Sequence, residues 1–187
     1  MRFKPILIFL LILSSYFIIN LLNYGRPVYD LGINIDDQIP FLNWFVYFYI
    51  LYFILMFVPF LFIENKKVTL YYGISIVIAN FFFIFLPTSI FRPFIESTNV
   101  TNYLVNLVYF LDKPYNLFPS LHAALLTLGS YLLFSYKKDL AYKLLPLFLL
   151  SLVSTLFIKQ HYLLDILSGI VLAVVTIYLG KKFEKVI

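Results

Sequence analysis

Six long apolar runs constrain this sequence more than any other feature. Each run is close to the length of about 20 residues that a helix needs to cross a bilayer core about 30 Å thick. The runs cover residues 5–22, 41–63, 68–86, 119–135, 140–158 and 162–180. Each is apolar along its whole length and does not alternate, which favours helices over the strands of a membrane β-barrel. We therefore predict an all-α protein, a polytopic membrane bundle of about six transmembrane helices.

The composition excludes the main classes of soluble protein. Hydrophobic residues make up 63% of the 187 residues, against about 45–50% in ordinary soluble domains. A fold of this size could not bury them in one core, so we expect a single integral-membrane domain over residues 1–187, with the lipid bilayer as its solvent. The chain has no cysteine, which excludes a disulfide-stapled scaffold and a cysteine metal site.

The basic residues are unevenly distributed over the segments that connect the six runs. Ten of the 14 Lys and Arg residues fall on the side of the amino terminus, namely Arg2, Lys4, Lys66, Lys67, Lys137, Lys138, Lys143, Lys181, Lys182 and Lys185. By the positive-inside rule both termini lie in the cytoplasm, and we expect a protein of the cell membrane. The long connections 23–40 and 87–118 then lie outside, where we expect the active site. The net charge of +5 reflects this topology and indicates no nucleic-acid partner.

The two histidines of the chain are both predicted at the outer membrane face. His122 follows Pro119 by three residues, in the first turn of the fourth run, and His161 lies where the fifth run ends and the sixth begins. Asp165 follows His161 by four residues, a spacing that places two side chains on one helical face. Its carboxylate can hold an imidazole N–H there and raise the basicity of the ring. We therefore predict a His–Asp pair.

Cations near these histidines predict an anion site. Arg92, Lys113 and Lys159 lie within a few residues of the predicted outer membrane ends, and Ser120 adds a hydroxyl at a helix N-terminus. Phosphate fits such a site best: one imidazole attacks phosphorus and the other protonates the leaving oxygen, without metal or other cofactor. The competing interpretation, a histidine-metal site, has only two His and one Asp as ligands, and the basic neighbours would repel a cation.

Two stretches of the sequence resemble a known family. Pro119-Ser120-Leu121-His122 and residues 154–165 resemble the second and third signatures of the type 2 phosphatidic acid phosphatases, and Arg92-Pro93 resembles the end of the first. The signatures occupy residues 87–165. The resemblance implies a six-helix membrane enzyme with an outward-facing site, in agreement with the apolar runs.

The resemblance also implies roles for individual residues. His161 would be the nucleophile that becomes phosphorylated, and Asp165 its orienting partner. His122 would be the acid that protonates the leaving group. Arg92 and Ser120 would bind the phosphate.

The sequence departs from the family pattern at three positions. Phe85 stands where the first signature opens with a lysine, Leu121 replaces the glycine of the second, and Thr155 replaces the arginine of the third. Two phosphate-binding cations are therefore missing. Lys113 and Lys159 are each predicted outside and close to a signature, so we expect them to bind substrate in their place.

Three functions remain open at this point. The first is a lipid phosphate phosphatase that hydrolyses a phosphomonoester or diphosphate of a membrane lipid through a phosphohistidine intermediate. The Pro-Ser-Leu-His sequence also resembles the branch of the inositol phosphorylceramide synthases, lipid phosphotransferases that pass the group to an alcohol. The short outer connections leave little room for a second substrate, which favours hydrolysis. The third is a non-catalytic lipid-binding or flippase-like protein, suggested by the missing cations.

Overall fold

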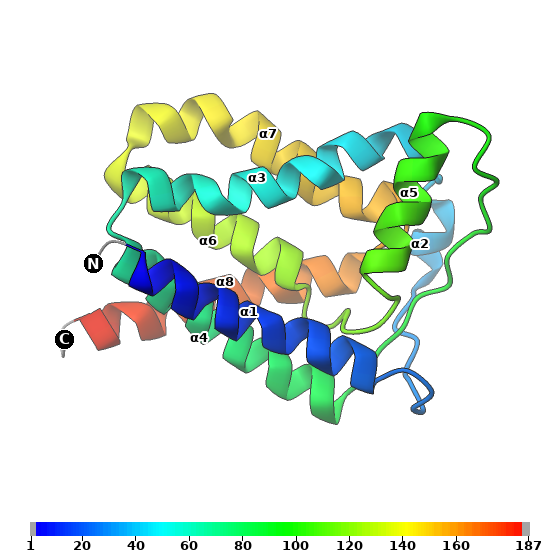
Figure 1. Ribbon diagram of the computed structural model, residues 1–187, viewed down its shortest axis with the longest axis horizontal. Coiled ribbons are helices and arrows are strands. Elements are labelled where there is room, and N and C mark those ends of the chain that lie inside the picture. The colour runs from blue at the N-terminus through cyan, green and yellow to red at the C-terminus, as the bar shows by residue number, and fades with distance from the viewer. Residues whose placement is uncertain (1–2, 185–187) are drawn as a thin grey trace.

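The computed structural model describes residues 3–184, and within them the chain is all-α, as predicted (Figure 1). Eight α-helices and one 3₁₀ turn occur in these residues, together with two isolated β-bridges. The elements are α1 (Lys4–Leu22), α2 (Asn34–Gln38), η1 (Asn43–Phe45), α3 (Val46–Phe62), α4 (Asn65–Phe85), α5 (Val100–Leu111), α6 (Leu121–Tyr136), α7 (Lys138–Phe157) and α8 (Leu163–Glu184).

Five helical segments of the described chain are long and apolar enough to cross a membrane. They are α1, the continuous stretch Asn43–Phe62, α4, α7 and α8. The sixth predicted span is α6, an apolar helix of 16 residues. It begins only at Leu121, because the backbone of Ser120 is extended and the Ser120 hydroxyl caps the helix by accepting the N–H of Ala123. All six apolar runs are thus helical, and the second and fourth helical segments are shorter than the runs 41–63 and 119–135 predicted for them.

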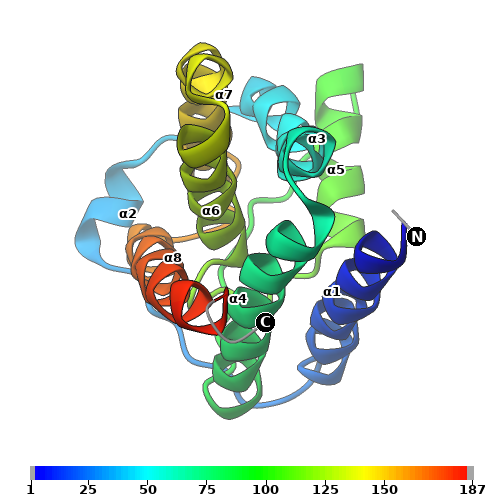
Figure 2. The ribbon, with the colours of Figure 1, turned by 90° about the vertical axis from the view of Figure 1, so that its left-hand side faces the viewer.

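Helix α6 lies at the centre of the bundle. It packs against α3, α4, α7 and α8, whereas α1 packs against α4 at the periphery (Figure 2). Residues 121–126 are all buried, so this part of α6 has no face toward lipid or water. Such a helix must be apolar nearly all round. A polar residue in it, here His122, therefore needs partners inside the protein.

The long helices run alternately in opposite directions, so the chain returns to the same two ends of the bundle (Figure 1). The start of α1 and the end of α8 lie at one end, and the connections 23–42 and 86–120 lie at the other. The basic residues assigned above to the cytoplasm gather at the first end, apart from Arg2 and Lys185, which lie outside the described residues. That this end faces the cytoplasm stays a prediction.

Two short helices interrupt the segments expected to be loops. Helix α5 begins after Asn99, whose side chain accepts the N–H of Asn102, and it packs Val105 and Val108 against residues of η1 and α3. Its 12 residues are too few to cross a membrane, so a search for long apolar runs misses it, as it misses the five residues of α2. Helix α5 lies across the end of the bundle rather than along it (Figure 1).

Helix α8 approaches the start of α6 closely at Gly169. A Cβ atom at Gly169 would lie 2.3 Å from the carbonyl oxygen of Ser120, so any side chain at this position would force the helices apart. Next to this contact, the backbone N–H of Ser120 donates a hydrogen bond to the carbonyl oxygen of Asp165 at 3.0 Å. The first turns of α6 and α8 are thereby held side by side.

Candidate active site

The two histidines meet although they are 39 residues apart in the sequence. His122 Nδ1 lies 3.0 Å from His161 Nε2, and the rings are set edge to face. His122 is in the first turn of α6, and His161 is in the turn between α7 and α8. Both side chains are buried. The structure therefore brings the two imidazoles together at one buried site, as the sequence predicts.

Asp165 lies on the far side of His161. Its Oδ2 is 3.5 Å from His161 Nδ1, and it also accepts the backbone N–H of Tyr162 at 2.8 Å. The carboxyl group is fully buried in the first turn of α8. The two residues thus have the neighbouring placement that the four-residue spacing predicts, and the Tyr162 bond fixes the carboxylate toward the ring.

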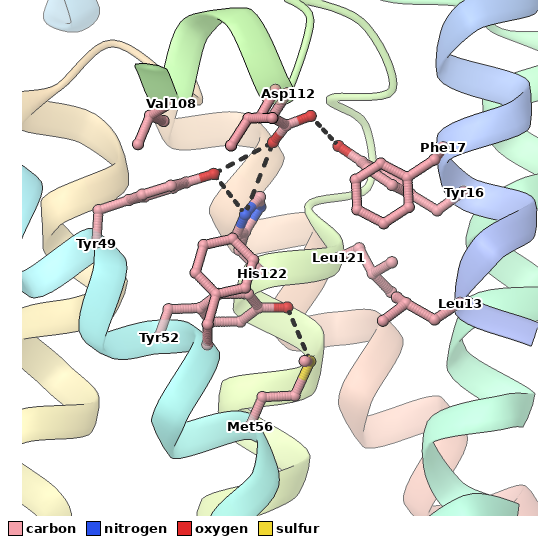
Figure 3. Close-up of a pocket in the computed structure, with 12 residues that line it drawn as sticks. Leu13, Tyr16, Phe17, Tyr49, Tyr52, Met56, Val108, Asp112, Leu121 and His122 are labelled. Atoms are coloured by element: carbon pink, nitrogen blue, oxygen red, sulfur yellow. Dashed lines mark hydrogen bonds and ion pairs between the residues drawn. The ribbon is translucent and has the colours of Figure 1, made fainter. Parts of the chain in front are cut away.

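A second carboxylate, Asp112, lies on the far side of His122 and was not among the predicted site residues. Asp112 Oδ2 is 3.9 Å from His122 Nε2. The hydroxyl of Tyr49 lies between them, 2.9 Å from His122 Nε2, and it donates to Asp112 Oδ2 at 3.2 Å (Figure 3). Tyr16 donates to Asp112 Oδ1 at 2.8 Å. Placing an ionisable residue next to a membrane end costs free energy, so such a residue is a candidate functional residue. That signal was available in the sequence.

Arg92 joins this cluster through two other residues. One guanidinium nitrogen, Nη1, donates to the backbone carbonyl of Asp112 at 2.6 Å, and Nη2 donates to the side-chain oxygen of Gln160. The guanidinium also stacks 4.6 Å above the ring of Tyr109. Because Gln160 directly precedes His161, these bonds place Arg92 beside the pair of histidines.

Several buried polar atoms around the histidines have no hydrogen-bond partner among residues 3–184. They are Arg92 Nε, Gln160 Nε2, His161 Nδ1 and Asp165 Oδ1. A buried polar group left unpaired costs about 1–3 kcal/mol, so such a concentration of them calls for an explanation. Arg92 Nε and Gln160 Nε2 belong to groups that can donate to an anion, whereas His161 Nδ1 is directed toward Asp165.

The remaining predicted substrate ligands are engaged in other ways. Lys159 Nζ donates to the carbonyl oxygens of Asp36 and Ile39 at 3.1 and 2.6 Å, and so ties α2 to the turn before His161. Lys113 Nζ lies 4.6 Å from the centre of the Phe110 ring. Ser120 is fully buried and its hydroxyl caps α6. Of the four residues predicted to bind substrate, only Arg92 has side-chain contacts with this cluster.

An apolar cavity of about 350 Å³ adjoins the site. It lies between α1, α3, α5 and α6, and His122 and Asp112 form part of its wall (Figure 3). Its other lining residues are Leu13, Tyr16, Phe17, Tyr49, Tyr52, Phe53, Met56, Val108, Leu111 and Leu121. Phe17, Phe53 and Leu111 are also exposed on the surface of the bundle. The cavity therefore opens sideways, between helices, toward the side that would face lipid.

No group of three or more His, Asp or Glu side chains within the described residues is arranged to hold a metal ion. In comparison with protein families, residues 68–185 match the PAP2 superfamily. No curated protein and no solved structure gives a significant match. The matched region runs from α4 to the end of α8 and includes both histidines and both carboxylates of the site, whereas α1 and α3 precede it.

Proposed function

The chain belongs to the PAP2 superfamily, whose members are generally phosphatases, and on this premise we propose that it is a lipid phosphate phosphatase. It hydrolyses a phosphomonoester or diphosphate of a membrane lipid without a metal ion. The observation that carries this proposal is the buried contact of His122 with His161 at 3.0 Å, beside unpaired donors of Arg92 and Gln160. A tetrahedral phosphate bound beside the two imidazoles would pair these donors and place phosphorus next to His161.

The reaction begins with attack by the nucleophile. His161 Nε2 uses its lone pair to form a bond to phosphorus while the bond from phosphorus to the lipid oxygen breaks. Asp165, 3.5 Å from His161 Nδ1, keeps the ring proton on that nitrogen, so Nε2 is free to attack. His122 Nδ1 gives a proton to the departing lipid oxygen. The products of this half are the lipid alcohol and phosphohistidine.

Water completes the reaction. His122, now neutral, takes a proton from a water molecule whose oxygen attacks the phosphohistidine, and the bond between nitrogen and phosphorus breaks. Phosphate leaves and both histidines return to their starting states. Arg92 and the amide of Gln160 donate to the non-bridging oxygens and stabilise the charge that they carry in the transition state.

The adjoining cavity would hold the part of the lipid next to the phosphate. Its lining is almost wholly apolar and reaches the wall that contains His122. A lipid held there by its tail presents its phosphate to the histidines in one orientation, which reduces the entropic cost of reaction. The site end of the bundle would then lie at the extracytoplasmic surface, as the distribution of basic residues predicts.

One observation favours a second candidate, a lipid phosphotransferase similar to the inositol phosphorylceramide synthases. Among the described residues the site contains one Arg or Lys, the half-buried Arg92, against the two buried carboxyl groups of Asp112 and Asp165, because the family's lysine and arginine are replaced by Phe85 and Thr155. Such a site balances a singly charged phosphodiester better than a doubly charged monoester. Hydrolysis and transfer share the phosphohistidine step and differ in the group that attacks second.

The experiment is a product analysis of the purified protein in detergent. Phosphatidate, phosphatidylglycerophosphate and a polyprenyl diphosphate are each supplied with a chelator, with and without inositol or another alcohol, and the lipids are identified by mass spectrometry. We expect phosphate release without alcohol, unaffected by chelation and lost in His161→Ala. Thr176→Val is the matched control: Thr176 is buried in α8, about 16 Å along the helix from Asp165. Product that requires alcohol would identify a transferase, and no product from any lipid would favour the non-catalytic alternative.

A further inference from the structure

Asp112 has more side-chain partners in the site than its place between the first and second family signatures suggests. It follows α5 directly and is 9% exposed. Tyr16 from α1 and Tyr49 from α3 donate to its two oxygens, and His122 of α6 lies 3.9 Å away. Helices that are distant in the sequence thus converge on this one carboxylate.

The four site residues form a continuous chain of contacts with the same pattern at both ends. Asp112 Oδ2 lies 3.9 Å from His122 Nε2, His122 Nδ1 lies 3.0 Å from His161 Nε2, and His161 Nδ1 lies 3.5 Å from Asp165. Each imidazole therefore has one nitrogen toward the other ring and one toward a carboxylate. A carboxylate beside an imidazole stabilises its protonated form and fixes which nitrogen carries a proton.

Resting on the proposed phosphatase function, we propose that Asp112 is a positioning residue for His122, acting directly and through Tyr49. The Tyr49 hydroxyl donates to Asp112, so its oxygen is free to accept the Nε2–H of His122. This leaves the second proton of the charged ring on Nδ1, on the side where the phosphate would lie. As the bond from His161 to phosphorus forms and the bond to the lipid oxygen breaks, that Nδ1 proton passes to the lipid oxygen. His122 becomes neutral and keeps its Nε2–H toward Tyr49 and Asp112.

The burial of Asp112 is costly, which argues against a purely structural role. Burial raises the pKa of the Asp112 carboxyl, although the charge of Arg92 and the Tyr16 hydrogen bond act in the opposite direction. Arg92 does not form an ion pair with the carboxylate, since its Nη1 bonds the backbone carbonyl of the same residue. Among the described residues Tyr16, Tyr49 and His122 face the carboxylate, and the charges of Arg92 and His161 also act on it. The Asp112 carboxylate accepts hydrogen bonds from the Tyr16 and Tyr49 hydroxyls and lies beside His122. Its negative charge can therefore balance a positive charge on the His122 imidazole.

The test uses two phosphate esters with different needs for a proton. The leaving group of dodecyl phosphate is an alkoxide, which needs a proton from the general acid. The leaving group of 4-nitrophenyl phosphate is a stable phenolate, which does not. The measurement is the first-turnover release of each alcohol by the full-length protein in detergent. For Asp112→Asn we expect a loss of about 10- to 100-fold on dodecyl phosphate, within the range that a general acid supplies. The loss on 4-nitrophenyl phosphate should be less than about threefold.

Asp36→Asn is the matched control. Asp36 is also a buried aspartate at this end of the bundle, but its carboxylate accepts the backbone N–H groups of Ile33 and Leu163. Asp36→Asn should change the release rates from dodecyl phosphate and from 4-nitrophenyl phosphate by the same factor. Tyr49→Phe provides a second variant in case Asp112→Asn folds poorly, and it should show the same selective loss to a smaller degree. Equal losses on the two esters in both Asp112→Asn and Tyr49→Phe, or no loss on dodecyl phosphate, would overturn the inference.

A second readout does not depend on turnover. The chain has two histidines, so labelling with ¹⁵N-histidine gives ring signals from His122 and His161 alone. Asp112→Asn should shift the ring signals of His122, whose Nε2 lies 3.9 Å from Asp112 Oδ2, more than those of His161. Unchanged His122 signals would overturn the assignment of Asp112. Wild-type protein that cleaves neither ester, but whose His122 signals respond to Asp112→Asn, would overturn the proposed phosphatase and retain the contact between Asp112 and His122.

Discussion

Gly169 of α8 lies against the carbonyl oxygen of Ser120, the residue that caps α6. This contact and the hydrogen bond from Ser120 N–H to the Asp165 carbonyl set the distance between the two helices that carry the site. The separation of His122 from His161 therefore depends on a glycine that has no part in the chemistry.

Gly169→Ala should displace the two histidines, although the added methyl group lies nearest to the backbone of Ser120 and not to either ring. The added methyl group would lie 2.3 Å from a backbone oxygen, and overpacking of this kind costs about 1–3 kcal/mol. Displacing the helices by about 1 Å would lower the turnover of a lipid phosphate by about 10²-fold. Gly73→Ala is the control, because its Cβ would meet only the flexible end of Ile12, at 3.3 Å. Full activity and stability in Gly169→Ala would contradict this account of the helix contact.

Removing each histidine should stop a different half-step. His161→Ala should lower turnover of the lipid phosphate by at least about 10³-fold and abolish labelling of the protein by ³²P substrate, since no nucleophile remains. His122→Ala should also lower turnover, yet still become labelled from 4-nitrophenyl phosphate, whose leaving group needs no acid. The measurement is acid-labile ³²P on the denatured protein. Labelling of His161→Ala would place the phosphoryl group on another residue.

Lys159 should contribute to stability rather than to substrate binding. Its ammonium holds two carbonyls next to α2, and hydrogen bonds to a charged group contribute about 1.5–3 kcal/mol each. Lys159→Met should lower the thermal unfolding midpoint and leave KM for the lipid phosphate unchanged. The opposite result, a raised KM at an unchanged midpoint, would restore the role predicted for this residue from the sequence.

Asp112 should make the folded state less stable as the pH rises. Burial raises the pKa of its carboxyl in the folded protein above the value of about 3.9 in the unfolded chain, so the folded state binds this proton more tightly. The contribution of Asp112 to stability should therefore be greatest below about pH 4. It should fall as the pH rises through the pKa of this carboxyl in the unfolded chain and then through its pKa in the folded protein. Thermal unfolding between pH 4 and pH 7 should show a smaller decline in Asp112→Asn than in the wild type. An identical decline in both proteins would show that this carboxyl is not the source.

Filling the apolar cavity should discriminate between long and short substrates. Leu13 lines the cavity from α1, and Leu13→Trp would occupy part of its volume of about 350 Å³. KM for a long-chain lipid phosphate should rise by about tenfold, the effect of about 1.4 kcal/mol of lost binding. The rate on 4-nitrophenyl phosphate, which has no tail, is the internal control. Equal effects on both substrates would mean that the tail lies elsewhere.

The sequence predicts those features of the molecule that depend on neighbouring residues. The long helices follow from uninterrupted apolar runs. The spacing of four residues predicts the proximity of His161 and Asp165, although His161 lies in the turn before α8 and not on its face. Helix α5 could not be found in the same way, because it is shorter than a membrane span and its buried face is defined only by packing on η1 and α3.

Other features depend on the assembly of the whole bundle. The partners of Asp112 come from α1, α3 and α6, so its place in the site emerges only when these helices pack together. Lys113 and Lys159 were expected at the phosphate because they are close to the signatures in the chain. Their ammonium groups are instead directed by local loop structure, toward the Phe110 ring and the carbonyls next to α2.

The cavity beside the histidines draws much of its wall from α1 and α3, whereas the proposed chemistry lies in the segment from α4 to α8. If the proposed function holds, recognition of the lipid chain and cleavage of its ester belong to different parts of the polypeptide. Under that proposal, substitutions in the first third of the chain, apart from Tyr16 and Tyr49, which bond Asp112, would alter which lipid is accepted while the reacting groups stay in place. Evolution would then be able to diversify substrates in this architecture by changing the cavity-lining residues of two helices other than these two tyrosines, while the reaction stays the same.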